Sequence, residues 1–200
     1  MKLYDYPDCP YCQKVRVLLV EKELSYETVL VDLRKQEQKN PEFLRLNPYG
    51  KVPVLEDEDL IIYDSTIINE YLEDEYPEPP MMPEDSAGRA RVRTLEDYAD
   101  NSFLPRTGLV LAELAKPEAG RDAERLARYQ TEIGRGLAWL DSSLSGKEYL
   151  VGGFSIADIA FVPGVLILPQ LGVEIDPRWH NLTAWIARLR ERTSVRSLGL

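Results

Sequence analysis

The stretch Leu3-Tyr4-Asp5-Tyr6-Pro7-Asp8-Cys9-Pro10-Tyr11-Cys12 opens the chain and decides its fold. Its apolar, tyrosine-bearing start predicts a strand over residues 2–6. From Cys12 to Leu19 the apolar residues recur at helical spacing, which predicts a helix over residues 10–22. Cys9 therefore falls in the turn between the strand and the helix, at the place where the helix begins.

Cys9 and Cys12 are the only cysteines among the 200 residues. Backbone N–H groups at a helix N-terminus have no partner inside the helix, and the helix dipole adds partial positive charge there. Helix N-termini and C-x-x-C geometry lower a cysteine pKa from ~8.5 into the range of ~3.5–7.5. We therefore expect Cys9 to be a catalytic thiolate nucleophile and Cys12, one turn further, to be the candidate resolving thiol.

Three other interpretations of this cysteine pair exist. A structural zinc site needs four ligands, and His180 is the only histidine, so we expect no metal. A permanent disulfide is disfavoured because the cytoplasm keeps thiols reduced and Met1-Lys2 leads directly into the first strand without an export signal. An inert turn that holds two small apolar side chains stays open as the structural alternative.

Composition and charge narrow the function classes. The chain is 44% hydrophobic and 29% charged, which is typical of a globular protein. No apolar run reaches the ~18 residues of a membrane span, so we expect a cytoplasmic protein without a membrane segment. The net charge is -10, and the first 80 residues carry 18 acidic and 9 basic side chains. Without a basic stripe to neutralise phosphates, direct nucleic-acid binding is disfavoured.

Strand and helix patterns alternate over the first 76 residues. The run Thr28-Val29-Leu30-Val31 predicts a buried parallel strand over residues 26–32, covered on both faces. Asn40-Pro41 predicts the start of a short helix. The side chains expected to face inward from that helix are Phe43, Leu44 and Leu46.

A hairpin and a third helix are predicted next. Asn47-Pro48-Tyr49-Gly50 predicts a turn, and residues 52–55 and 60–63 predict an antiparallel pair around the acidic turn 57–59. Asp64 or Ser65 is expected to cap the third helix. The apolar face predicted for that helix is Ile67, Ile68, Tyr71 and Leu72.

The run Tyr76-Pro77-Glu78-Pro79-Pro80-Met81-Met82-Pro83 is too rich in proline for a helix or a central strand. We therefore expect a domain at residues 1–76, a linker at 77–85 and a second domain at 86–200.

The second domain is all helical by pattern. Residues 86–115 predict a long helix bent near Pro105, and residues 121–144 predict another in which Gly134 and Gly136 indicate close packing. Ser155-Ile156-Ala157-Asp158 predicts a capping box. A last helix carries Leu182, Trp185, Ile186 and Leu189.

This order of elements, with C-P-x-C at the first helix and a helical half after it, resembles the cytosolic glutathione transferase superfamily. The resemblance covers nearly the whole chain. The marker segments are Cys9-Pro10-Tyr11-Cys12, Val52-Pro53, Asp64-Ser65 and Phe154-Ser155-Ile156-Ala157-Asp158. Residues 46–55, 67–72 and 76–83 look most like the stringent starvation protein A branch, which binds RNA polymerase. The C-P-Y-C motif itself resembles glutaredoxin and the cysteine-type transferases that reduce mixed disulfides.

The resemblance implies a glutathione site beside Cys9. It implies a cis peptide bond before Pro53, which turns the backbone of Val52 toward glutathione, and a role for Ser65 in receiving the γ-glutamyl carboxylate. Lys39 and Lys51 are the candidates for the glycyl carboxylate. The whole set implied is Pro10, Tyr11, Lys39, Lys51, Val52, Pro53, Asp64 and Ser65. Ordinary exposed lysines, and a purely structural Pro53 and Ser65, are the alternatives.

Several other residues have both a structural and a functional interpretation. His180 is expected to be a surface or capping residue, and the resemblance gives Asp158 a role in folding. Tyr98, Asn101, Phe103 and Arg106 are interpreted either as the lining of a second-substrate pocket or as helix core.

We therefore expect the glutathione transferase fold: α/β plus all-α, with a thioredoxin-like βαβ-αββα N-terminal domain followed by an all-helical domain. The resemblance implies a homodimer. The expected function is a glutathione-dependent thiol transferase or thiol–disulfide oxidoreductase, with glutathione as co-substrate and a small electrophile or a disulfide as the second substrate. Resolution of the mixed disulfide by glutathione is the alternative to resolution by Cys12. The alternative is a non-catalytic transcription factor that docks on RNA polymerase near residues 77–83. A dehalogenating or isomerising transferase is a third, lesser possibility.

Overall fold

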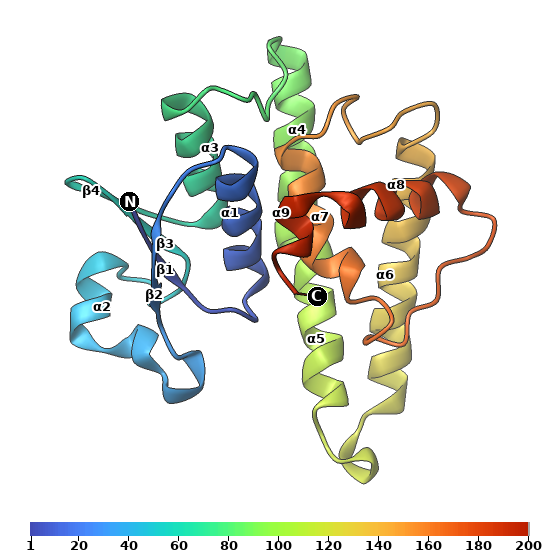
Figure 1. Cartoon of the computed structure of the whole chain (residues 1–200). Helices are drawn as coiled ribbons and strands as arrows, with labels where there is room; N and C mark the ends of the chain where they lie inside the picture. The colour runs from blue at the N-terminus through green and yellow to red at the C-terminus, as the bar shows by residue number, and fades with distance from the viewer. Residues whose placement is uncertain (200) are drawn as a thin grey trace. The chain divides into compact units, whose positions relative to one another are not determined.

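The computed structural model of the chain describes residues 1–199 as two compact units, one from Met1 to Met81 and one from Met82 onward (Figure 1). The division falls inside the proline-rich segment 77–85.

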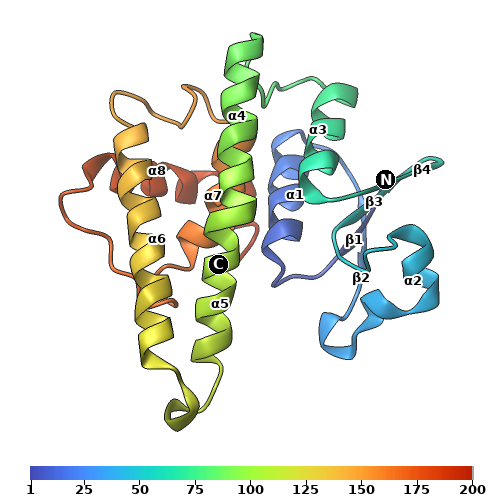
Figure 2. The ribbon, with the colours of Figure 1, turned by 180° about the vertical axis from the view of Figure 1, so that it is seen from behind.

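The first unit is a four-stranded sheet with helices on both faces. Its elements are β1 (Lys2–Asp5), α1 (Pro10–Glu21), β2 (Glu27–Leu30), α2 (Pro41–Leu46), β3 (Val54–Asp57), β4 (Leu60–Tyr63) and α3 (Ser65–Glu75), with 3-10 turns at Leu33–Lys35 and Glu37–Lys39. The strand order is β2-β1-β3-β4; β1 and β2 are parallel, and the other pairs are antiparallel. Helices α1 and α3 lie on one face of the sheet and α2 lies on the other (Figures 1 and 2). The predicted thioredoxin-like βαβ-αββα order is confirmed.

One prediction about strand β2 is wrong. The strand is parallel to β1, as expected, but it lies at the edge of the sheet and its side chains are not buried on both faces. Leu30 is 61% exposed, and only Val31, which follows the strand, is in the core. An edge strand has a neighbour on one side only, so the same apolar run is less covered than in a central parallel strand.

Two helical residues expected to face inward are also exposed. In α2 only Phe43 is buried, and Leu44 is 36% exposed because a six-residue helix presents a single narrow face to the sheet. In α3 Ile68 and Leu72 are buried as expected, but Ile67 is 56% exposed. The buried stripe of α3 includes polar residues, which rotates Ile67 outward; the stripe is Ser65, Ile68, Asn69, Leu72 and Glu73.

A buried ion pair joins the end of α1 to α3. The Lys22 ammonium lies 2.7 Å from a Glu73 carboxylate oxygen, and the two side chains are 0% and 6% exposed. The same ammonium donates to the carbonyl oxygens of Tyr76 at 2.7 Å and Pro79 at 3.0 Å. Glu73 in turn accepts from the N–H of Met81 at 3.0 and 3.1 Å. This arrangement, called here the Lys22 clamp, fixes the segment that follows α3.

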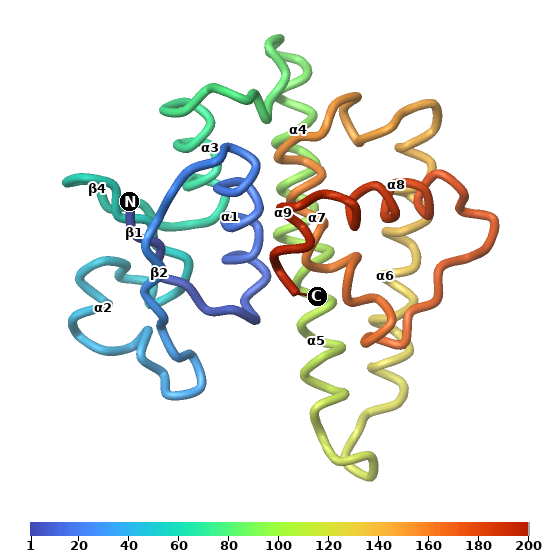
Figure 3. Tube along the Cα trace, viewed as in Figure 1, coloured from blue at the N-terminus to red at the C-terminus, as the bar shows by residue number. Residues whose placement is uncertain are grey.

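The second unit is helical, as predicted. Its elements are α4 (Ser86–Tyr98), a π-helical turn (Ala99–Phe103), α5 (Leu104–Leu114), a 3-10 turn (Glu118–Gly120), α6 (Ala123–Ser143), α7 (Ile156–Leu166), α8 (His180–Glu191) and α9 (Thr193–Arg196). Every residue of α7 is buried, so this helix is the centre of the unit. In the tube of Figure 3, α4 and α5 form one nearly continuous rod. The irregularity expected near Pro105 is the π-helical turn just before it, because Pro105 has no N–H to offer a carbonyl of the preceding helical turn.

Phe103 ties this π-helical turn to the neighbouring helices. It is 1% exposed, and its ring centroid lies 5.6 Å from that of Phe161. A Cβ atom added at Gly164 would lie 2.6 Å from the Phe103 ring, and one added at Gly136 would lie 2.9 Å from the hydroxyl of Tyr98, whereas Gly134 faces open space. Close packing is therefore confirmed at Gly136 but not at Gly134.

Asp158 organises the start of α7. The predicted capping box with Ser155 is present. The carboxylate accepts from the Ser155 N–H at 3.0 Å, the Ser155 hydroxyl at 3.1 Å, the Leu150 N–H at 3.0 Å and the Trp185 indole N–H at 2.9 Å. Burial raises the pKa of this carboxyl to about 6, against the effect of these hydrogen bonds. One side chain thus joins a loop, a helix start and α8.

Candidate functional site

Cys9 lies where the sequence places it, at the N-cap of α1. Its backbone is extended, its N–H donates to the Tyr6 carbonyl at 3.0 Å, and its carbonyl accepts from the Gln13 N–H at 3.0 Å. The side chain is partly exposed, and both cysteines are free thiols. The Cys12 thiol first, and then the N–H groups of Cys12 and Tyr11, hold the pKa of the Cys9 thiol below its ordinary value.

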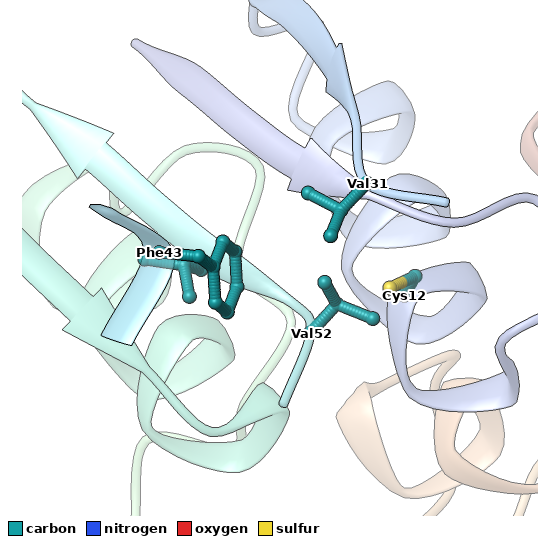
Figure 4. Packing of buried hydrophobic residues seen from close by; sticks show 5 residues of the cluster. Cys12, Val31, Phe43 and Val52 are labelled. Carbon is teal, nitrogen blue, oxygen red and sulfur yellow. The ribbon is translucent and has the colours of Figure 1, made fainter. Parts of the chain in front are cut away.

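Cys12 has the opposite character. It is 0% exposed and belongs to a hydrophobic cluster with Val31, Phe43 and Val52 (Figure 4). Burial first, and the neighbouring Cys9 second, raise the pKa of the Cys12 thiol. The two sulfurs are therefore different: Cys9 is suited to the thiolate form, and Cys12 is held as a protonated thiol.

The turn that leads into Cys9 is held by residues that the sequence did not point out. The carbonyl of Pro7 accepts from the Gln13 side-chain amide at 3.1 Å and from the Arg16 guanidinium at 2.8 Å. Arg16 also pairs with the buried Asp5 carboxylate at 3.3 Å. These contacts fix the backbone before Cys9. The only signal in the sequence is that Gln13 and Arg16 are polar residues in the first turns of an apolar helix.

Four of the implied glutathione residues are placed near the cysteines: Pro10 and Tyr11 by their position in the chain, and Val52 and Pro53 by the fold. Pro10 and Tyr11 form the first turn of α1. The peptide bond from Val52 to Pro53 is cis, as the resemblance implied. Val52 packs in the same cluster as Cys12 (Figure 4). Cys9 packs against that cluster. The structure therefore brings Val52 together with both cysteines.

The two candidate lysines lie at the turn before Val52. Lys39 is exposed, but its ammonium donates to the carbonyl oxygens of Tyr49 at 3.3 Å and Gly50 at 3.1 Å. Lys51 is exposed, and its carbonyl accepts from the Asn47 side chain at 2.8 Å. Lys39 thus has a structural task in this turn, and a role for either lysine in binding a carboxylate stays a prediction.

Asp64 and Ser65 begin helix α3, as expected. Asp64 is the N-cap, with a φ of 80°, and its carboxylate accepts from the Thr66 N–H at 2.9 Å. Ser65 is 3% exposed, and its hydroxyl accepts from the ammonium of Lys14 at 3.3 Å. Lys14 itself is 0% exposed. The sequence did not single out Lys14; its signal is a lysine within the apolar pattern of α1.

The candidate second-substrate residues of the other unit divide into two groups. Phe103 is core, and Tyr98 packs its ring 4.8 Å from that of Trp139. Asn101 is exposed and donates to Asp97, while Arg106 pairs with Glu132 at 2.6 Å.

His180 is the exposed first residue of α8.

Two kinds of feature are absent from residues 1–199. These residues contain no group of three or more histidine, cysteine, aspartate or glutamate side chains placed to hold a metal ion. None of their helices combines the length and the apolar character that a membrane span requires.

Comparison with known proteins identifies the family. The family model described as "Glutathione S-transferase, N-terminal domain" matches residues 3–80. The model described as "Glutathione S-transferase, C-terminal domain" matches residues 105–193. The chain belongs to the glutathione S-transferase family. Both the family and the fold predicted from the sequence are thus confirmed.

Relatives within the glutathione S-transferase family fall into more than one branch. A stringent starvation protein A homolog from Pasteurella multocida is 34% identical over 95% of this chain and 86% of its own length. A zeta class glutathione S-transferase from Euphorbia esula is 34% identical over 95% of this chain and 83% of its own length. Among solved structures, the glutathione transferase URE2P8 from Phanerochaete chrysosporium, with oxidized glutathione, matches with a TM-score of 0.89 and 28% identity over 99% of this chain and 92% of that chain.

Proposed function

We propose that this chain is a glutathione-dependent thiol–disulfide oxidoreductase, a thiol transferase in which Cys9 is the nucleophile. The observation that carries the proposal is the contrast between the two sulfurs. Cys9 is partly exposed at a helix start and its thiol pKa is lowered, while the neighbouring Cys12 is buried and its thiol pKa is raised. A thiolate at a helix N-terminus attacks disulfide sulfur atoms readily.

The proposed reaction has two exchange steps. The Cys9 thiolate attacks the glutathione sulfur of a mixed disulfide, which forms a Cys9–glutathione disulfide and releases the substrate as a thiolate. A second glutathione, as its thiolate, then attacks the glutathione sulfur bound to Cys9, which yields oxidised glutathione and restores the Cys9 thiolate. Cys12 has to lose its proton before it attacks Cys9 and displaces glutathione. Because Cys12 is 0% exposed, we assign the second step to glutathione and assign Cys12 the task of stabilising the Cys9 thiolate.

We propose that the chain divides into a glutathione-binding domain at residues 1–76, a linker at 77–85 and a helical domain at 86–200. The glutathione site proposed for this reaction lies in the first of these domains. The backbone of Val52 and the Ser65 end of α3 are its proposed anchors, since Val52 packs beside Cys12 and a helix N-terminus favours a carboxylate. The further contacts proposed are Pro10, Tyr11, Lys39, Lys51, Pro53 and Asp64. We propose that the protein acts as a cytoplasmic homodimer on disulfides or small electrophiles.

The pH dependence of alkylation by iodoacetamide tests the proposal. We expect one fast-reacting thiol, lost in Cys9→Ser and kept in Cys12→Ser, with a pKa well below the ~8.5 of a free cysteine. Incubation with oxidised glutathione should place a mixed disulfide on Cys9, detected by mass spectrometry of the tryptic peptide. An unshifted thiol that forms no mixed disulfide would reject the thiol-transferase function.

A second candidate function is supported by one specific surface. Residues 77–80 are exposed, and the Lys22 ammonium of the clamp donates to the carbonyl of Pro79 within them. The chain is also 34% identical to a stringent starvation protein A homolog. We therefore retain, as the alternative, a non-catalytic factor that binds RNA polymerase through this segment. In a pull-down with RNA polymerase, binding that survives Cys9→Ser but not Pro79→Ala with Pro80→Ala supports this alternative.

A further inference from the structure

Lys14 is a buried cation that the exchange chemistry at the two sulfurs does not use. Its side chain is 0% exposed, and its ammonium donates to the Ser65 hydroxyl oxygen at 3.3 Å. Lysine is almost never buried this completely unless it is paired. Among its interactions, the contact with Ser65 joins α1 to the first residue of α3.

This contact decides what the Ser65 hydroxyl can do. A hydroxyl has one hydrogen to donate and two lone pairs, whereas an ammonium has three hydrogens and no lone pair. In the bond with Lys14, Ser65 is therefore the acceptor, and its own hydrogen stays available for an acceptor elsewhere. Capping of α3 does not need that hydrogen, because the Asp64 carboxylate already accepts from the Thr66 N–H.

The group that fits such a donor is a carboxylate. Ser65 stands at the N-terminus of α3, where N–H groups and the helix dipole favour negative charge. A hydroxyl that accepts from a cation is polarised and donates more strongly. Both effects act at the same residue, and a neutral ligand gains little from either.

We infer that Lys14 is a positioning residue for the carboxylate of the γ-glutamyl group: it holds the Ser65 hydroxyl as a donor toward bound glutathione. The inference rests on the proposed function, because it takes glutathione as the thiol that binds. It adds to that function a source of selectivity for the γ-glutamyl end of the peptide, located on the same helix as the two cysteines.

Calorimetric titration with two peptides tests this role. One is glutathione, and the other is γ-aminobutyryl-cysteinyl-glycine, which is the same molecule without the γ-glutamyl carboxylate. We expect Lys14→Met and Ser65→Ala each to raise the Kd for glutathione about 10-fold, as for the loss of one hydrogen bond to a charged group. The double variant should be no weaker than either single variant, because Lys14 acts on the ligand only through the Ser65 hydroxyl. The Kd for the shorter peptide should stay within about 2-fold in all of them.

Two further variants separate positioning from structure. Lys14→Arg keeps a cationic donor and should restore the preference for glutathione over the shorter peptide. Asn69→Ala removes another fully buried polar side chain one turn further along α3 and should leave both Kd values unchanged. Circular dichroism checks the fold of each variant. If Lys14→Met does not fold, Lys14→Arg decides: it must keep the wild-type preference, and loss of that preference overturns the inference.

The remaining outcomes are also decisive. Equal weakening of both peptides by Lys14→Met, or effects of Lys14→Met and Ser65→Ala that multiply in the double variant, would overturn the positioning role while leaving glutathione binding intact. If the wild-type protein binds neither peptide, the proposed function itself fails, and the role of Lys14 fails with it.

Discussion

Removal of the charge from Glu73 should destabilise the first unit by a measurable amount. In Glu73→Gln the Lys22 ammonium stays buried without its carboxylate, and only the carbonyls of Tyr76 and Pro79 remain as its acceptors. Breaking a buried pair by removing one partner costs ~3–5 kcal/mol, and the two remaining carbonyl bonds lower our expectation to ~2–4 kcal/mol. The Met81 N–H keeps an acceptor in the glutamine side-chain oxygen, so the expected cost comes from the buried Lys22 ammonium.

The double variant Lys22→Met with Glu73→Gln separates the pair from its parts. Because no buried charge is left unpaired, it should be less destabilised than the sum of its two single variants, with a coupling of about 1–3 kcal/mol. Glu75→Gln, an exposed carboxylate on the same helix, is the matched control and should change the stability by less than about 0.5 kcal/mol.

The assay has to report on the first unit. All three tryptophans, at positions 139, 179 and 185, belong to the second unit, so their fluorescence follows the wrong part of the chain. Urea unfolding followed by circular dichroism, together with hydrogen exchange of peptides from residues 1–81, reports on the Lys22 clamp. A cost below about 1 kcal/mol in Glu73→Gln, or strict additivity in the double variant, would refute the reasoning.

Four other predictions concern the sulfurs and the helical unit. Cys12→Ala removes the group that contributes most to lowering the Cys9 thiol pKa, so alkylation of Cys9 at pH 6 should slow relative to pH 9. The Asp158 carboxyl has its pKa raised to about 6 in the folded state, so it binds its proton more tightly there than in the unfolded chain. Its contribution to stability should therefore be greatest below about pH 4 and decline by about 3 kcal/mol toward pH 6. Urea titrations at several pH values should show this decrease of the unfolding free energy with pH. In Asp158→Asn the decrease should be absent, and the unfolding free energy should be lower by about 2–4 kcal/mol. Gly164→Ala, against the Phe103 ring, should lower the unfolding free energy by about 2 kcal/mol. Gly134→Ala, in open space on α6, should raise it by about 1 kcal/mol in the same assay.

The sequence predicts the features of this fold that depend on neighbouring residues. The period of the apolar residues after Cys12 locates α1 and therefore the N-cap position of Cys9. The capping box at Ser155 and Asp158 is equally local and is present in the structure. In these cases the residues that decide the conformation lie within one or two turns of one another.

Predictions that depend on distant neighbours were less successful. Whether the run at β2 is central or at an edge depends on the strand order, which the local pattern does not contain, so the exposure of Leu30 was not foreseen. The contact of Lys14 with Ser65 joins residues 51 positions apart, and polar residues on the buried face of a helix look like solvent-facing ones in a sequence. The candidate site was therefore predicted at its sulfurs but not at the lysine behind Ser65.

The four hydrogen bonds of Asp158 also bear on how the protein is made. The first unit has its last strand by Tyr63 and its Lys22 clamp by Met81, so it can fold while the ribosome is still translating the rest. The second unit has to wait, because the indole that completes the hydrogen bonding of Asp158 is synthesised 27 residues after it. A released chain that is truncated between these two residues would contain helix α7 without the Trp185 indole that donates to Asp158. Such a fragment would carry all of the first unit, while its helical part would also lack α8 and α9.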